Sequence, residues 1–129
     1  MKAVATWAGG YRAECDIRDF RLMADETSEY GGSDTGPMPT ELLVGSLATC
    51  FALAVAHAAK KRDVELPDLT VRAESFRAEG EARYERFVVE VESSYGEGLE
   101  RLVEAAKRYC FVSSTLIRGA EIEYRSRSR

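Results

Sequence analysis

The sequence predicts an α+β fold in which helices pack against antiparallel sheet. Short runs that alternate polar and apolar residues, typical of strands, lie at the start and in the middle of the chain. Helix-like segments lie between and after these runs. The resulting order of strands, long helix, strands, amphipathic helix and a last strand is typical of the α+β class. The chain has 129 residues, the length of one ordinary domain, so we expect a single domain over residues 1–129.

The first third of the chain predicts a meander of three strands. The runs KAVATW (2–7), YRAECDI (11–17) and FRLMADE (19–25) are short and separated by turn residues. Cys15 alternates with apolar residues in the second run, so we interpret it as a structural residue. Residues 27–40 are dense in Gly, Pro, Ser and Asp and predict a loop.

A long helix is predicted over residues 40–62, with Thr40 as its N-cap. The stretch 42–59 has no formal charge and is close to the minimum length of a membrane span. It is rich in Ala, Gly, Ser and Thr rather than Leu or Ile, so we favour a helix buried on all sides over a membrane span. One sheet covers one side only. A second sheet or a second subunit should therefore cover the other.

The second half of the chain predicts two more strands, two helices and a final strand. Apolar residues alternate in the two strand segments and recur at helical spacing in the segment that follows them. A shorter helix then ends at a glycine. The predicted ranges are strands at 66–80 and 83–95, helices at 97–110 and 112–117, the stop at Gly119, and a strand from Ala120 to Tyr124.

Composition excludes several classes of protein. The formal net charge is −4, and basic residues are interleaved with acidic ones, which argues against a nucleic-acid binder. The basic end YRSRSR (124–129) is interpreted as a solvated tail. Three cysteines are too few for a disulfide scaffold. The opening MKAVATWAGG lacks the apolar segment of a signal peptide, so we expect a cytoplasmic protein.

The cysteines are the residues best able to take part in a reaction, although the local sequence alone favours a structural role for Cys50. A free cysteine in the middle of a helix is usually a small buried hydrophobe, and no cation lies within helical reach of it. His57 is two turns further on, about 10 Å along the axis, too far for a Cys–His pair. We interpret it as a structural residue or as one that supports the site without reacting. Cys110 precedes a predicted helix whose free N–H groups would favour a thiolate. Neither a zinc site nor a catalytic triad is supported by the spacing.

Two motifs nevertheless resemble those of the OsmC/Ohr family of thiol peroxidases. GPMPTELLVGSLATCF (36–51) has the family's Gly-x-x-Pro start and the Ala-rich helix with a cysteine inside it. CFVSSTLIRGAEIEY (110–124) is similar to the family's second signature, in which a cysteine is followed by a helix and a last strand. The resemblance implies an intertwined homodimer, with antiparallel sheets around long central helices and an active site at the subunit interface.

The resemblance also implies a reaction. Cys50 would attack an organic hydroperoxide and become a sulfenic acid, and Cys110 would resolve it as an intramolecular disulfide. An external dithiol reductant would then reopen the disulfide. No metal, haem or flavin cofactor is expected, because sulfur does the redox chemistry.

An arginine from the N-terminal strands is implied as the cation that holds the thiolate and positions the peroxide. Arg12 is our first choice, with Arg18 and Arg21 in reserve. In the family a glutamate that pairs with this arginine directly follows the helix-starting proline. Here Thr40 stands at that position and Glu41 comes next, which turns the side chain by about 100°. We include Glu41 with Arg12 in the predicted site.

Two functions follow, and both stay open. The first is a two-cysteine peroxidase for alkyl or lipid hydroperoxides in oxidative or osmotic stress defence. The alternative is an OsmC-like protein that binds an apolar small molecule and has weak or no peroxidase activity. Retention of Cys50 and Cys110 favours the enzyme. Thr40 in place of the glutamate, and Phe111 in place of the proline usual after the second cysteine, favour the alternative.

Overall fold

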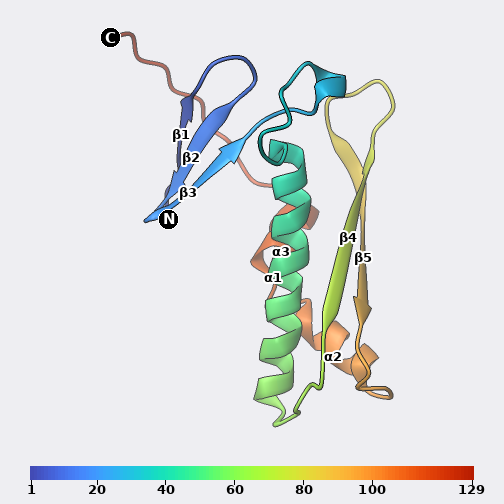
Figure 1. The fold of residues 1–129 in the computed structure, drawn as a ribbon. Coiled ribbons are helices and arrows are strands. Elements are labelled where there is room, and N and C mark those ends of the chain that lie inside the picture. The colour runs from blue at the N-terminus through green and yellow to red at the C-terminus, as the bar shows by residue number, and fades with distance from the viewer. The chain divides into compact units, whose positions relative to one another are not determined.

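A computed structural model describes all 129 residues and shows an α+β protein with antiparallel sheets (Figure 1). The chain forms two compact units, Met1–Gly45 and Ser46–Arg129, and each is described by itself. The expectation of one domain over the whole chain stays a prediction. The elements in chain order are β1 (Val4–Trp7), β2 (Ala13–Ile17), β3 (Phe20–Ala24), the 3₁₀ turn η1 (Ser28–Tyr30), α1 (Pro39–Lys61), β4 (Thr70–Arg77), β5 (Tyr84–Glu92), α2 (Leu99–Ala106) and α3 (Phe111–Arg118).

The first unit contains the predicted meander, which is confirmed. Its strands are antiparallel in the order β1-β2-β3. Cys15 lies opposite Ala5 on one side and Leu22 on the other, and its side chain is half-buried in the sheet. This place in a ladder fits the structural role that we expect for Cys15.

A buried carboxylate organises the loop between β3 and α1. Asp25 is fully buried and accepts hydrogen bonds from the Thr35 hydroxyl (2.7 Å) and from the N–H groups of Thr35, Glu26 and Ser33. The Thr35 hydroxyl is the main cause of a pKa lowered to about 2 for Asp25. Burial opposes this effect and the backbone N–H groups add to it. The charged form of Asp25 therefore stabilises this loop.

Asp25→Asn is expected to lower the melting temperature by several degrees at neutral pH, because an amide cannot accept all of these bonds. The pKa of Asp25 is lower in the folded chain than its ordinary 3.8. Its contribution is therefore present above that value and lost as the pH falls toward about 2. The melting temperatures of the wild type and of Asp25→Asn should therefore converge as the pH falls through this range. Asp19→Asn, at an exposed position, is the control. A gap that is absent or independent of pH would contradict the role assigned to Asp25.

Helix α1 begins one residue before the predicted start, so Thr40 is not its N-cap. Pro39 occupies the first helical position, where its missing N–H costs nothing. Glu41 accepts a hydrogen bond from the N–H of Met38 at 3.0 Å, which is the glutamate half of a capping box. The carboxylate of Glu41 thus stabilises the start of the helix.

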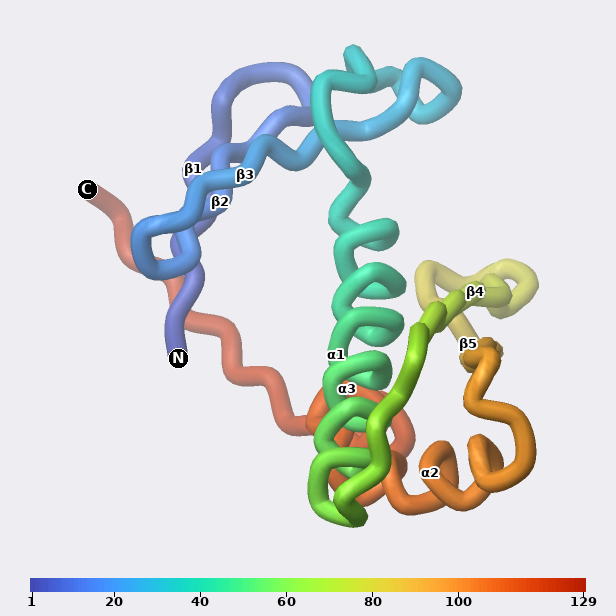
Figure 2. Tube along the Cα trace, turned by 60° about the horizontal axis from the view of Figure 1, so that its bottom comes forward, coloured from blue at the N-terminus to red at the C-terminus, as the bar shows by residue number.

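The core of the second unit forms around one face of α1, between that helix, the β4–β5 hairpin and α2. Figures 1 and 2 both show α2 beside the C-terminal end of α1. Apolar side chains of β4 and β5, among them Val71 and Val89, pack against this core from the sheet. The buried members are Phe51, Ala54, Val55, Ala58 and Ala59 of α1, Leu102, Ala105 and Ala106 of α2, and Cys110.

Within the single chain α1 is covered on one side only, and the expected cover of its other side by a second subunit stays a prediction. Leu53 is 73% exposed, and Ala56 and His57 are exposed on the same side. The reason is that only one layer of the second unit covers the helix. By length and composition α1 could cross a membrane, but one of its faces is packed in the core of the second unit, as in the core helix of a globular domain.

Helix α2 and the C-terminal segment of the second unit differ from the predicted ranges. Helix α2 is shorter than 97–110: Gly98, with φ at 107°, precedes it, and the Tyr109 N–H bonds to the Ala106 carbonyl at 2.9 Å in a tighter turn after it. Helix α3 ends at Gly119 as expected. The final strand predicted from Ala120 to Tyr124 does not form, because no neighbouring strand offers ladder hydrogen bonds to this segment.

Candidate active site at the junction of α1 and α3

Two thiols sixty residues apart in the sequence meet in the second unit. Cys50 lies on α1 and is half-buried, and Cys110 is 1% exposed at the start of α3. The Cys50 thiol lies within hydrogen-bonding reach of the Cys110 sulfur, and neither cysteine is in a disulfide. The structure therefore brings together two of the four predicted site residues. Two free thiols in contact are a pair that an oxidant can join as a disulfide.

Cys110 is the N-cap of α3, because the helix begins at Phe111, one residue before the predicted start. Its sulfur accepts a hydrogen bond from the N–H of Ser113 at 3.4 Å, as a serine or aspartate oxygen does at an N-cap. Burial raises the pKa of the Cys110 thiol. The Ser113 side chain and N–H, Cys50 and the Val112 N–H together outweigh burial, so that the pKa is lowered. The Ser113 hydroxyl itself donates to the Cys110 carbonyl at 3.3 Å. The site thus favours a thiolate at Cys110.

Ser113→Ala is expected to raise the pKa of Cys110, because the variant loses the hydroxyl and keeps the backbone N–H. The measurement is the pH titration of the Cys110 Cβ chemical shift by NMR in isotope-labelled protein. Ser114→Ala, which removes the neighbouring hydroxyl, is the matched control. An unchanged midpoint for Cys110 in the Ser113 variant would show that the serine hydroxyl does not tune this thiol.

An aromatic contact joins the segment before Cys110 to α1. The rings of His57 and Tyr109 lie edge to face, with centroids 4.6 Å apart. His57 thus has a packing partner, which fits its interpretation as a structural residue. The sequence does not predict Tyr109 as a neighbour of the site, since nothing in its local pattern distinguishes it from an ordinary half-buried aromatic.

The three candidate arginines lie in the first unit, where each has a local contact. A guanidinium nitrogen of Arg12 donates to a nearby main-chain carbonyl at a long 3.5 Å. Arg21 forms an ion pair with Asp16 at 2.6 Å, and the guanidinium of Arg18 lies over the ring of Phe20. Of the three arginines, Arg12 therefore has the weakest contact within the first unit. The contact between an N-terminal arginine and Cys50 stays a prediction, as does the part of Glu41, whose carboxylate bonds to Met38.

Comparison with known proteins assigns the family. The family model described as OsmC-like protein matches residues 31–125, and the chain belongs to this family. No curated protein matches the sequence at a significant level.

Solved structures of the same fold come from several bacteria. An OsmC-like protein of Mycoplasma pneumoniae superposes with a TM-score of 0.77 at 16% identity, covering 92% of this chain and 86% of that one. The organic hydroperoxide resistance protein OsmC of Legionella pneumophila gives 0.67 at 24% identity, with 92% and 90% covered. A putative organic hydroperoxide resistance protein of Vibrio cholerae, with captopril in one active site, gives 0.66 at 24%, with 92% and 85% covered. These likenesses show the fold.

Proposed function

We propose that the protein is a thiol-dependent peroxidase that reduces organic hydroperoxides in oxidative or osmotic stress defence. The observation that carries the proposal is the contact between the thiols of Cys50 and Cys110. Membership of the OsmC-like family adds support, since three of the similar structures are named for organic hydroperoxide resistance.

The cycle needs only sulfur chemistry. The Cys50 thiolate attacks the distal oxygen of the hydroperoxide: a sulfur–oxygen bond forms, the oxygen–oxygen bond breaks, and the leaving alkoxide takes a proton to become an alcohol. The Cys110 thiolate then attacks the sulfenic sulfur, a disulfide forms, and the oxygen leaves as water. An external dithiol reduces the disulfide by two electrons and is itself oxidised to a disulfide.

The hydrogen-bond pattern suits this division of roles. A resolving thiol reacts as its thiolate, and the pKa of Cys110 is lowered by the groups that surround it. Its sulfur already touches Cys50, so a sulfenic acid formed there would be attacked at once. Cys50 is the less buried of the two, as a group that meets an external substrate should be.

We further propose an intertwined homodimer with the active site at the subunit interface. The exposed apolar side of α1 supports this, because a side chain such as Leu53 gains from burial by a second subunit. In that assembly Arg12 would hold the Cys50 thiolate and the peroxide oxygens, with Glu41 beside it. Apolar walls would favour alkyl and lipid hydroperoxides over hydrogen peroxide. We place the activity in the cytoplasm, where dithiol reductants are maintained.

The alternative function, binding of an apolar small molecule with weak or no turnover, has two observations in its favour. Glu41 is engaged at the start of α1 rather than free to pair with an arginine. Phe111, which replaces the proline usual after the second cysteine, is 84% exposed beside Cys110 and could line a ligand site.

A turnover assay separates the two functions. The peroxidase should consume cumene hydroperoxide in the presence of dithiothreitol for many equivalents, and faster than it consumes hydrogen peroxide at equal concentration. The measurement is the loss of hydroperoxide with time, against a protein-free control. Consumption no faster than that control would favour the binding protein.

A further inference from the structure

A basic groove lies between the C-terminal end of α1 and α2, within the second unit. It has a volume of about 470 Å³, within the size range of small-molecule sites. Both views of the fold show these two elements side by side (Figures 1 and 2). The residues that line the basic groove are Arg62, Arg101, Glu104, Ala105, Lys107 and Arg108.

The basic groove is opposite in charge to the chain as a whole. The chain has a formal net charge of −4, yet four of the six lining residues are cationic. The one carboxylate, Glu104, is bound to Lys107 at 2.7 Å. Three guanidinium groups remain without a carboxylate in the groove, and a site lined by one sign of charge attracts the opposite ion.

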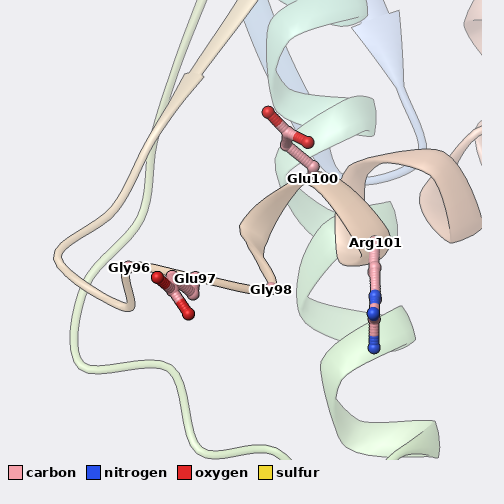
Figure 3. Close-up of a pocket in the computed structure, with 5 residues that line it drawn as sticks. All are labelled: Gly96, Glu97, Gly98, Glu100 and Arg101. Atoms are coloured by element: carbon pink, nitrogen blue, oxygen red, sulfur yellow. The ribbon is translucent and has the colours of Figure 1, made fainter.

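Two of these arginines have no ion-pair partner. The side chain of Arg101 points away from both Glu97 and Glu100, its acidic neighbours in the adjoining pocket (Figure 3). The guanidinium of Arg108 lies 5.8 Å from the centre of the Tyr109 ring and forms no ion pair. Both residues are exposed, so their N–H groups are available to a ligand.

We propose that the basic groove binds a small soluble oxyanion with two or more negative charges, of the phosphate-ester or pyrophosphate class. Guanidinium groups match the geometry of phosphate oxygens and bind them through paired hydrogen bonds. Three unneutralised cations favour a multivalent anion over a single carboxylate. Ala105 is the only apolar lining residue and is buried, so the groove has no exposed apolar side chain to hold a lipid chain.

The test is calorimetric titration of the whole protein with pyrophosphate at low, constant ionic strength. The groove variant is Arg101→Ala with Arg108→Ala. The control variant is Arg72→Ala with Arg86→Ala, which removes the same charge from exposed positions on β4 and β5. The wild type and the control should bind alike, and the groove variant about tenfold or more weakly.

Equal loss in both variants would show a diffuse charge effect, and no saturable binding to the wild type would show that there is no site. Either result overturns the proposal. Binding should also weaken as salt is added, because the contacts are electrostatic. This inference is independent of the peroxidase cycle, since both arginines lie outside the thiol pair and pyrophosphate is not a substrate of that cycle. Peroxide turnover in the groove variant should remain that of the wild type.

Discussion

Cys50→Ser is expected to abolish peroxide consumption, with a loss of about 1,000-fold or more, because Cys50 is the sulfur that the hydroperoxide oxidises and Cys110 is almost fully buried. A serine hydroxyl is similar in size but is not oxidised by a hydroperoxide. The variant should therefore fold normally, with circular dichroism and melting temperature close to those of the wild type. The measurement is the rate of cumene hydroperoxide loss with a dithiol in excess.

Cys15→Ser is the matched control for this variant. Cys15 lies in the β2 ladder of the first unit and has no part in the thiol pair, so its removal should leave turnover unchanged. Activity that survived in the Cys50 variant, or disappeared only in the Cys15 variant, would contradict the assignment of Cys50 as the reacting sulfur.

Cys110→Ser is expected to have the second largest effect, on a different step. The first oxidation of Cys50 should proceed, but no thiol is then in place to resolve the sulfenic acid. In the absence of reductant, one equivalent of hydroperoxide should leave Cys50 as a sulfenic acid that dimedone traps almost completely. The wild type should show almost no adduct, because its disulfide forms first. Intact-protein mass spectrometry measures both.

Excess hydroperoxide extends this comparison. The Cys110 variant should pass to the sulfinic acid, which thiols do not reduce, whereas the wild type is protected by its disulfide. Ser114→Ala, a neutral change on the same helix, should behave like the wild type. A wild type that forms as much dimedone adduct as the Cys110 variant would show that Cys110 does not resolve.

The periodic parts of the sequence predicted the fold well. The three N-terminal strands and the β4–β5 hairpin follow alternation, a pattern imposed by burial of one face, and α1 follows from a long uncharged apolar stretch. The prediction that Cys50 and Cys110 form the site rests on motifs rather than on periodicity. Their contact was beyond the reach of the sequence alone, because separation along the chain carries no information on distance in space.

Other parts could not be predicted, for physical reasons that differ. Residues 120–124 alternate as a strand does, but alternation does not provide a neighbour to pair with. The 97–110 segment kept its apolar face, yet Gly98 and the tight turn at Tyr109 shortened the helix at both ends. No sequence pattern predicts that Asp25 is buried and organises its loop. A signal was present in the many N–H donors of its Gly- and Ser-rich loop, which require an acceptor.

The measurement that tests the central claim most directly is a peptide map of the reduced protein before and after one equivalent of cumene hydroperoxide. We expect a rapid intramolecular disulfide between the peptides that contain Cys50 and Cys110, with Cys15 still free and no disulfide in Cys50→Ser. If Cys50 and Cys110 both stayed reduced, or were oxidised no faster than Cys15, the two-cysteine peroxidase would be contradicted.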